Sequence, residues 1–273
     1  MLGQPPIFGD DWLKRARAAT TGDSWIVHVI ETFDTTGQIY LSTLRLWFTR
    51  FPLKPKRKQG LRSRLESSKN DEHLGGVNEL AWWAFMFREG LIVTPLPTTT
   101  SPRPDFELQQ PTECFVEVST LNVSEKDKKN FETEEDSGVL DHADTIRRVI
   151  GKLTAEKQQQ MKYAADHQRP GVLVIFDYTT WSGFGTLFFR TLGEFLLGKR
   201  FGFKTFPPEV SAIVYLERKV LEGRIALSRH HSAIYYNPLA LYSLAPGTFP
   251  SLNQFWSQLG FTESKSPEHW LWL

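Results

Sequence analysis

Residues 171–178, which read GVLVIFDY, form a continuous apolar run in which the first charge comes at Asp177. A run of this length without alternating polar positions is typical of a strand that is buried on both faces of a sheet. It follows a long stretch, 142–167, for which hydrophobic periodicity predicts a helix. We therefore expect an α/β fold in which a crossover helix leads into a central strand.

The residues before this helix add four more elements. Segment 75–90 has apolar positions at helical spacing, and we predict a helix that begins after Gly75-Gly76, with Asn78 as its cap, and ends at Gly90. β-Branched and aromatic residues between proline-rich breaks predict strands at 91–97, 103–109 and 113–121. The order is helix, three strands, helix, strand, which indicates a mixed central sheet.

The outer parts of the chain are less regular. We divide it into an N-terminal elaboration (1–70), a core (71–180) and a C-terminal extension of the same α/β domain (181–273). The elaboration has a predicted strand at 24–33 and a strand or short helix at 37–51, and a charged solvent loop is expected at 124–138. In the extension the predicted elements are a helix at 187–198, strands at 210–218 and 232–238, and a helix at 251–260.

Composition places the chain among soluble globular proteins, with 273 residues, 40% hydrophobic and 23% charged. The net charge of +1 favours no polyanionic partner by itself, so any electrostatic footprint must be local. The single cysteine, Cys114, excludes an internal disulfide and favours a reducing, cytoplasmic setting, where burial is its expected role. We expect neither a signal peptide nor a membrane span, and no membrane partner.

Two carboxylates stand out in RPDFELQQPTECFVEVSTLN, residues 103–122. If the hairpin has a three-residue loop centred on Pro111, Asp105 lies opposite Glu117 and both side chains leave the same face. Like charges placed across two strands are destabilising unless a cation lies between them, and a divalent metal such as Mg²⁺ satisfies that need. A two-residue loop would put the two carboxylates on opposite faces.

The long helix and the helix at 75–90 each carry a charged residue of interest. The apolar stripe Ile146, Ile150, Leu153 continues at the same steps to Lys157, Gln160 and Ala164. Lys157 therefore either meets a counter-charge at the sheet or extends outward past its edge. Glu79, in the predicted first turn of the other helix, is either a helix-dipole residue or a third acid of the site.

A basic segment precedes the core. It is either a nucleic-acid contact or a solvated flexible linker, because Pro, Gly and Ser surround it. Its charged residues are Lys54, Lys56, Arg57, Lys58, Arg62 and Arg64. The adjacent pair His230-His231 falls near a predicted strand and is interpreted as structural.

These residues together resemble the PD-(D/E)XK superfamily of restriction endonuclease-like nucleases. Pro104-Asp105 match its first element and Glu117-Val118-Ser119 part of its second, while Glu79 matches an acid on the preceding helix. The predicted order of elements over residues 76–178 is similar to the αβββαβ core of that family. The sequence departs from the family at Ser119, where a lysine is expected, and Lys157 resembles the lysine that some members carry on the following helix.

The resemblance implies a fold, an activity and a site. It implies a restriction endonuclease-like core and a metal-dependent nuclease that hydrolyses phosphodiester bonds, with DNA the expected substrate. Asp105, Glu117 and the carbonyl of Val118 would hold Mg²⁺ or Mn²⁺, with Glu79 completing the shell. The catalytic residues that it implies are Glu79, Asp105, Glu117, Lys157 and Gln160. Backbone contacts would come from the basic segment together with Arg147 and Arg148.

Two alternatives stay open from the sequence. The same fold with a degenerate site would act as a nucleic-acid-binding or assembly module without cutting. An unrelated α/β protein would use Asp105 and Glu117 structurally. Because restriction-like nucleases often dimerise to cut both strands, a homodimer is a further expectation that the resemblance allows.

Overall fold

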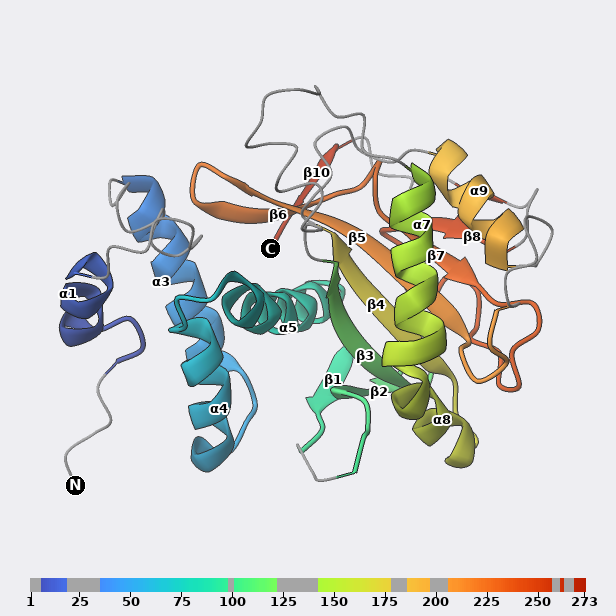
Figure 1. Ribbon diagram of the computed structural model, residues 1–273, viewed down its shortest axis with the longest axis horizontal. Coiled ribbons are helices and arrows are strands. Elements are labelled where there is room, and N and C mark those ends of the chain that lie inside the picture. The colour runs from blue at the N-terminus through green and yellow to red at the C-terminus, as the bar shows by residue number, and fades with distance from the viewer. Residues whose placement is uncertain are drawn as a thin grey trace. The chain divides into compact units, whose positions relative to one another are not determined.

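The computed structural model describes residues 6–18, 35–97, 101–121, 142–177, 186–196, 206–256, 261–262 and 268–273. In these residues the chain is a mixed α/β structure with a curled mixed sheet (Figure 1). It separates into two compact units, which are described in turn. The first comprises Met1–Arg88, Lys219–Ala226 and Trp272–Leu273, and the second Glu89–Arg218 and Leu227–Leu271. These bounds differ from the predicted segments 1–70, 71–180 and 181–273.

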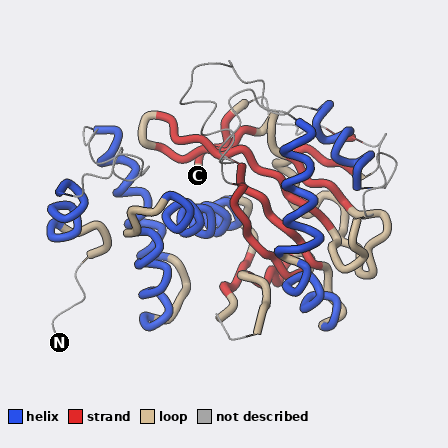
Figure 2. The backbone as a smooth tube through the Cα atoms, in the orientation of Figure 1, coloured by secondary structure: helices blue, strands red, loops and turns tan. Residues whose placement is uncertain are grey.

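The strands of the second unit, red in Figure 2, form a sheet. Their order is β1-β2-β3-β4-β5-β7-β8-β9. These strands are β1 (Ile92–Pro95), β2 (Phe106–Gln110), β3 (Cys114–Leu121), β4 (Gly171–Asp177), β5 (Ala212–Leu221), β7 (Ala233–Tyr236), β8 (Asn253–Phe255) and β9 (Phe261–Thr262). Strand β6 (Arg224–Ser228) pairs with β5 and with β10 (Trp270–Trp272). The end of β5 and the start of β6 belong to the first unit.

Three parallel strands form the centre of the sheet. β3 pairs parallel with β4, and β4 pairs parallel with β5, whereas β1, β2 and β3 form an antiparallel meander. Every residue of β4 is buried, which confirms the prediction made from GVLVIFDY. A continuous apolar strand is what a position in the middle of a parallel sheet requires, because both of its faces are covered.

Helices α7 (His142–Gly151) and α9 (Thr186–Leu196) pack on one face of this sheet (Figure 1). The apolar layer between them and the strands includes Ile146 and Leu153 of α7, Phe188 of α9, and Leu173 and Ile213 of the sheet. The predicted helix at 187–198 and the predicted strands at 210–218 and 232–238 are therefore present as α9, β5 and β7.

The predicted helix at 142–167 is interrupted. A π turn, η1 (Lys152–Glu156), separates α7 from α8 (Gln158–Asp166), and the amide of Lys157 donates to the carbonyl of Lys152 over 2.9 Å. A π turn holds one more residue than an α turn, so it rotates everything that follows relative to the stripe on α7. On α8 the buried positions are accordingly Met161 and Ala164.

The predicted C-terminal helix at 251–260 is wrong for the residues that the structure describes there. Residues Asn253–Phe255 form β8, and Phe255 packs against Phe189 and Tyr235 in the core. The side-chain amide of Gln254 donates to the carbonyls of Phe249 and Leu252, at 2.7 and 2.8 Å. Such bonds from side chain to backbone compete with the helical pattern. The predicted strand at 24–33 and loop at 124–138 lie outside the described residues.

The lone cysteine is buried, as predicted. Cys114 has no exposed surface, and burial raises the pKa of its thiol to about 12. Its thiolate is therefore disfavoured, and this residue is a small core side chain. None of the helices that the structure describes is long and apolar enough to cross a bilayer.

The first unit is helical, and its helices are α1 (Asp10–Ala18), α3 (Thr35–Arg50), α4 (Pro55–Leu65) and α5 (Asn70–Arg88). Segment 37–51 is thus a helix, with buried Tyr40, Leu44 and Trp47 at helical spacing. The basic segment is a helix too and not a flexible linker. Pro55 stands in its first turn, where a proline is favourable, and Leu61 and Leu65 are buried.

Helix α5 begins at Asn70, ahead of the glycine pair that was predicted to precede it. Asp71 and Glu72 occupy its first turn, where they favour the positive end of the helix dipole, and Asn78 is buried in its interior instead of capping it. Gly76 serves packing, because a Cβ there would lie 3.1 Å from Leu65 of α4. One of the two glycines that looked like a helix boundary therefore allows two helices to approach closely.

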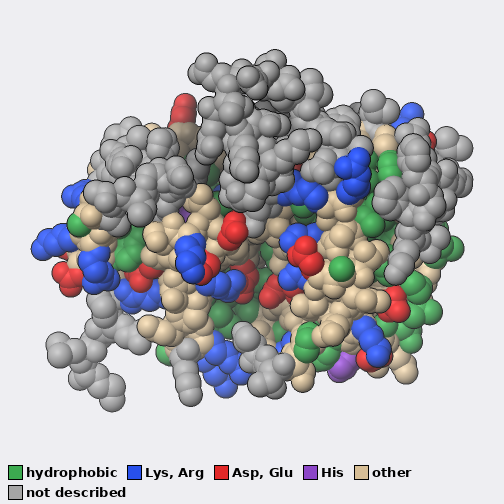
Figure 3. Space-filling view, in the orientation of Figure 1, with side chains coloured by type: hydrophobic (Ala, Val, Ile, Leu, Met, Phe, Trp, Pro, Cys, Tyr) green, Lys and Arg blue, Asp and Glu red, His purple; other side chains and the backbone are tan. Residues whose placement is uncertain are grey.

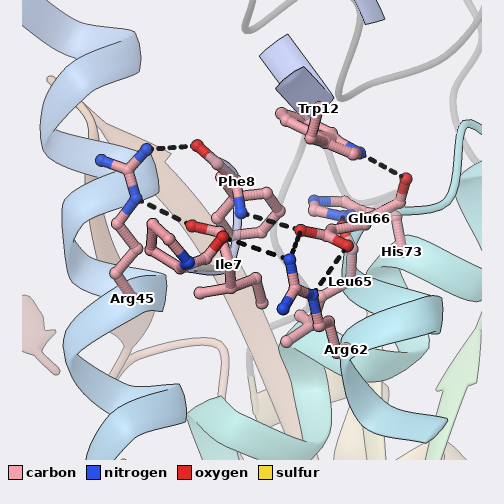
Figure 4. Close-up of polar contacts among 9 residues, drawn as sticks. Ile7, Phe8, Trp12, Arg45, Arg62, Leu65, Glu66 and His73 are labelled. Atoms are coloured by element: carbon pink, nitrogen blue, oxygen red, sulfur yellow. Dashed lines mark hydrogen bonds and ion pairs between the residues drawn. The ribbon is translucent and has the colours of Figure 1, made fainter. Parts of the chain in front are cut away.

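A polar network holds the segment before α1 against α4 (Figure 4). The Glu66 carboxylate accepts the amide of Phe8 at 2.9 Å and pairs with Arg62 at 3.0 Å. The Trp12 indole donates to the carbonyl of Glu66 at 2.9 Å. From α3, Arg45 donates to the carbonyls of Ile7, at 3.1 Å, and Phe8, at 2.5 Å. Phe8 is fully buried at the centre of this network.

His73 belongs to the same part of the unit. Its Nδ1 lies 2.7 Å from the carbonyl of Leu65, and its Nε2 lies 2.9 Å from the Tyr40 hydroxyl. A carbonyl only accepts, so Nδ1 of His73 donates to it. The ring connects α3, α4 and α5.

The turn between β5 and β6 packs on α3 within this unit. Gly223 has φ +77°, and a Cβ there would overlap the carbonyl of Thr36 and lie 2.9 Å from the Cβ of Ile39. Gly247 has nearly the same backbone, φ +80°, but no atom of the described residues lies within 4 Å of its Cβ position. A comparison of alanine substitutions at the two glycines therefore distinguishes the energetic cost of a positive φ from the cost of a steric clash.

We expect Gly247→Ala to lower the free energy of unfolding by about 1 kcal/mol, the cost of a left-handed residue with a Cβ. Gly223→Ala should lose at least about 2 kcal/mol more, because a backbone carbonyl cannot move aside as a side chain can. Urea unfolding of both variants measures the difference. Equal losses would show that the turn does not contact α3 as described.

Candidate active site

The β2–β3 hairpin brings the two predicted carboxylates together. Phe106 pairs with Val116, and Leu108 with Cys114, so that paired residue numbers add to 222. One step further along this register, Asp105 comes opposite Glu117. The predicted three-residue loop is confirmed, and the two-residue loop with its opposite-face arrangement is wrong.

Both carboxylates lie on the face of the sheet that the helices cover. On β3 this face carries Phe115, which packs edge-on against Tyr163 of α8, and Leu121, which joins the core layer beneath α7. Because side chains alternate along a strand, Glu117 and Ser119 point the same way. Glu117 is 3% exposed and Ser119 6% exposed.

Lys157 reaches Glu117 from the junction of η1 and α8. Its Nζ lies 2.6 Å from Oε1 of Glu117, and the side chains are 22% and 5% exposed. The predicted stripe suggested this contact, but the π turn produces it, because Lys157 stands at the point where the helix changes register. The alternative in which Lys157 extends outward past the sheet edge is wrong.

Asp105 is oriented by the backbone of the strand opposite. Its Oδ2 accepts the amide of Val118 at 2.9 Å, which holds the carboxylate beside Glu117. Its charge also acts on Lys157. Burial lowers the pKa of Lys157, but the ion pair and hydrogen bond with Glu117 and the charge of Asp105 outweigh burial, so the pKa is raised. Lys157 is therefore a cation at every physiological pH.

The donors at this site suit a hard divalent cation. Carboxylate and carbonyl oxygens are the ligands that Mg²⁺ prefers, and Asp105, Glu117 and Val118 can supply them. Lys157 is hydrogen-bonded to one Glu117 oxygen, so a metal would share that carboxylate with the lysine. Among the residues that the structure describes, no three His, Cys, Asp or Glu side chains are arranged around one point as a metal site.

Two predicted residues have other surroundings. Gln160 lies on α8 and is half-buried, whereas Met161 and Ala164 are the buried residues of this helix. Glu79 belongs to the first unit, where its carboxylate pairs with Arg64. Their catalytic roles stay predictions.

Three of the six basic residues of the segment have partners within their own unit. Lys58 Nζ donates to the carbonyls of Phe48 and Thr49 at the end of α3, over 2.8 and 2.9 Å. Arg62 pairs with Glu66, and Arg64 with Glu79. Lys54 and Arg57 are exposed, as is Arg147 on α7, whereas Arg148 is half-buried.

On the face shown in Figure 3, basic side chains are interspersed with acidic ones. Such a surface carries no broad field of one sign. The nucleic-acid contacts predicted for the basic segment and for α7 stay predictions.

The same sheet face holds a second polar group that sequence reasoning missed. Asp177, the last residue of β4, and Glu217, in the middle of β5, are register partners that are 0% and 2% exposed. The Tyr215 hydroxyl donates to Asp177, and Glu217 Oε2 lies 2.9 Å from His231 Nδ1. Burial, together with the charges of Asp177 and Glu217, raises the pKa of Tyr215 well above its ordinary value. Asp177, the acid at the end of the apolar run GVLVIFD, is the sequence feature from which this polar group could have been predicted.

Comparison with models of protein families, with curated proteins and with solved structures finds no match.

The Lys157–Glu117 pair can be tested by a double-mutant cycle. Lys157→Met leaves a carboxylate buried without its cation, and we expect a loss of about 1.5–3 kcal/mol in the free energy of unfolding. The double variant Lys157→Met/Glu117→Gln should lose clearly less than the sum of the two single variants, because it removes both charges. Urea unfolding at pH 7 measures the three values. Additive losses would contradict a direct pair.

The raised pKa of Lys157 sets the sign of its pH dependence. Stability from a group whose pKa is higher in the folded than in the unfolded state is complete below the unfolded value and is lost as pH rises through the folded value. We expect the stability difference between wild type and Lys157→Met to be constant at neutral pH and to shrink above the ordinary lysine value of 10.5. Unfolding measured from pH 7 to pH 11 checks this. A difference that grows in alkali would contradict it.

Proposed function

We propose that this protein is a metal-dependent nuclease with a restriction endonuclease-like core. The observation that carries the proposal is the 2.6 Å contact of Lys157 with Glu117, across from Asp105 on one face of the β2–β3 hairpin. Two carboxylates and a lysine on one sheet face are the groups that phosphodiester hydrolysis requires. The lysine comes from the following helix, which compensates for Ser119.

The order of elements supports the same proposal. Along the chain, α5 is followed by the antiparallel strands β1, β2 and β3, then by α7, η1 and α8, and then by β4, which pairs parallel with β3. This is the αβββαβ order that the resemblance implies. A π turn beside Lys157 also fits, because such insertions in helices are frequent at functional sites.

In this proposal each residue has a distinct task. Mg²⁺ or Mn²⁺, held by Asp105, Glu117 and the carbonyl of Val118, would supply a water of lowered pKa and stabilise charge on the phosphate. Asp105 is held in place by the amide of Val118. The Lys157 ammonium, a compact cation with three donors, would orient the attacking water or neutralise a phosphate oxygen. Glu117 would hold Lys157 in position.

A second candidate is a catalytically degenerate member of the same fold that binds nucleic acid or serves assembly. Two observations favour it. Ser119 replaces the motif lysine, and Lys157 already neutralises Glu117 directly, so the pair is stable as an internal ion pair. The two candidates differ in cleavage and not in fold.

The deciding experiment compares cleavage of supercoiled plasmid and of single-stranded oligonucleotides in Mg²⁺, in Mn²⁺ and in EDTA. We expect cleavage by the wild type only with metal, and rates at least about 100-fold lower for Glu117→Gln and Lys157→Ala. Matched controls are Glu107→Gln, on the same hairpin and face, and Lys152→Ala, in the preceding turn. These should retain activity within about twofold, since surface substitutions away from the site are usually nearly neutral.

Cleavage by Glu117→Gln at the wild-type rate would overturn the nuclease proposal. Nucleic-acid binding by folded wild type without cleavage in either metal would favour the degenerate module. Circular dichroism of each variant establishes that lost activity is not lost folding.

A further inference from the structure

Three histidines from two distant segments lie together in the second unit, away from the carboxylate hairpin. His230 and His231 occupy the turn between β6 and β7, and His269 stands immediately before β10. The ring centroid of His269 is 4.6 Å from that of His230 and 5.6 Å from that of His231. The nuclease proposal uses none of these residues.

The nitrogen atoms of two of the rings face each other. Nδ1 of His269 lies 3.1 Å from Nδ1 of His230. As a hydrogen bond, this contact needs one ring to donate and the other to accept. The same separation suits two neighbouring ligands of one metal ion, since metal–nitrogen bonds of about 2.0–2.1 Å place adjacent donors about 3 Å apart.

The third ring lies beside a buried carboxylate. Nδ1 of His231 lies 2.9 Å from Oε2 of Glu217, whose side chain is 3% exposed. A carboxylate next to a histidine is the usual support of a metal-binding imidazole. Ser228 Oγ stands in a similar place, 3.4 Å from Nε2 of His269.

The backbone that carries the rings is held firmly. The side-chain amide of Asn253 donates to the carbonyls of Arg229 and Ser232, at 2.8 and 3.1 Å, and so closes the turn on both sides of the histidine pair. The amide of Arg229 donates to the carbonyl of His269 at 2.8 Å, which ties the two segments together. Ligands that are already positioned lose little entropy when they bind.

We infer that His230 and His269, with His231 as a third ligand, bind a late first-row transition-metal ion such as Cu²⁺ or Zn²⁺. Imidazole nitrogen suits these ions, whereas Mg²⁺ prefers oxygen, so this site is chemically distinct from the carboxylate hairpin. Among the described residues no three donors already surround one point. His231 therefore reaches the ion by rotation of its side chain, and two rings are in place beforehand. The bound ion would join the β6–β7 turn to the C-terminal segment.

The test is a titration of the full chain, without an affinity tag, with Cu²⁺ in the presence of excess Mg²⁺. Isothermal titration calorimetry should give one equivalent of tightly bound Cu²⁺, and electron paramagnetic resonance should show coupling to at least two nitrogens. We expect His230→Ala/His269→Ala to weaken binding by at least about tenfold, as does Glu217→Gln through its effect on His231. His167→Ala, which removes an exposed histidine of α8, is the matched control and should bind as wild type does.

Glu117→Gln separates the two proposals, because it removes the hairpin carboxylate and should leave Cu²⁺ binding unchanged. Since His230 is exposed, its replacement should not unfold the chain. Copper binding that survives intact in the double histidine variant, or a spectrum with fewer than two coordinating nitrogens, would overturn the inference.

Discussion

The carboxylate of Glu117 constrains the second unit more than any other side chain. It sits in the middle of a strand that lies between β2 and β4, on a face covered by helices, where an isolated charge is costly to bury. The ammonium of Lys157 compensates the charge of Glu117, and this lysine directly follows the π turn η1. The path of the crossover helix, its change of register and the position of α8 are all consistent with bringing one ammonium to one carboxylate.

This arrangement also links stability to chemistry. A core ion pair is rarely a strong source of stability, because desolvation offsets the attraction between the charges. A leucine and a methionine in the two places would pack without that cost. A charged pair kept where an apolar pair would fit is therefore most simply explained by a task for the charges, which is the reasoning behind the proposed activity. Asp177 at the end of β4 and Glu217 within β5, buried on the same face, likewise have polar neighbours in Tyr215 and His231.

The parts of the structure that the sequence predicted well are those with short-range or periodic signals. The buried run at 171–178 and the hairpin register about Pro111 needed only strand geometry, and both are present. The errors have physical causes. Gly75-Gly76 resembled a helix boundary, although Gly76 serves the contact with Leu65. Residues 251–260 resembled a helix, but in β8 the side-chain amides of Asn253 and Gln254 donate to backbone carbonyls of neighbouring loops.

In the candidate site, too, some residues could be predicted from the sequence and others could not. The pairing of Asp105 with Glu117 followed from the hairpin register, and the apolar stripe on the crossover helix pointed to Lys157. The same count reached Gln160, which is half-buried, and Ala164, which is buried, whereas the π turn between them and the stripe on α7 was not foreseen. His269 was beyond reach, since its neighbours stand 39 residues away along the chain.

The first unit has a further consequence, which concerns synthesis. Its helices come from the beginning of the chain, yet the β5–β6 turn that packs on α3 and the final residues that contact Arg88 come from its end. The partners Arg88 and Trp272 are separated by 184 positions. The first unit therefore cannot be completed until residues 272 and 273 have been synthesised. The second unit likewise includes residues up to Leu271, so both units depend on contacts between segments that are far apart in the chain, and such contacts slow folding.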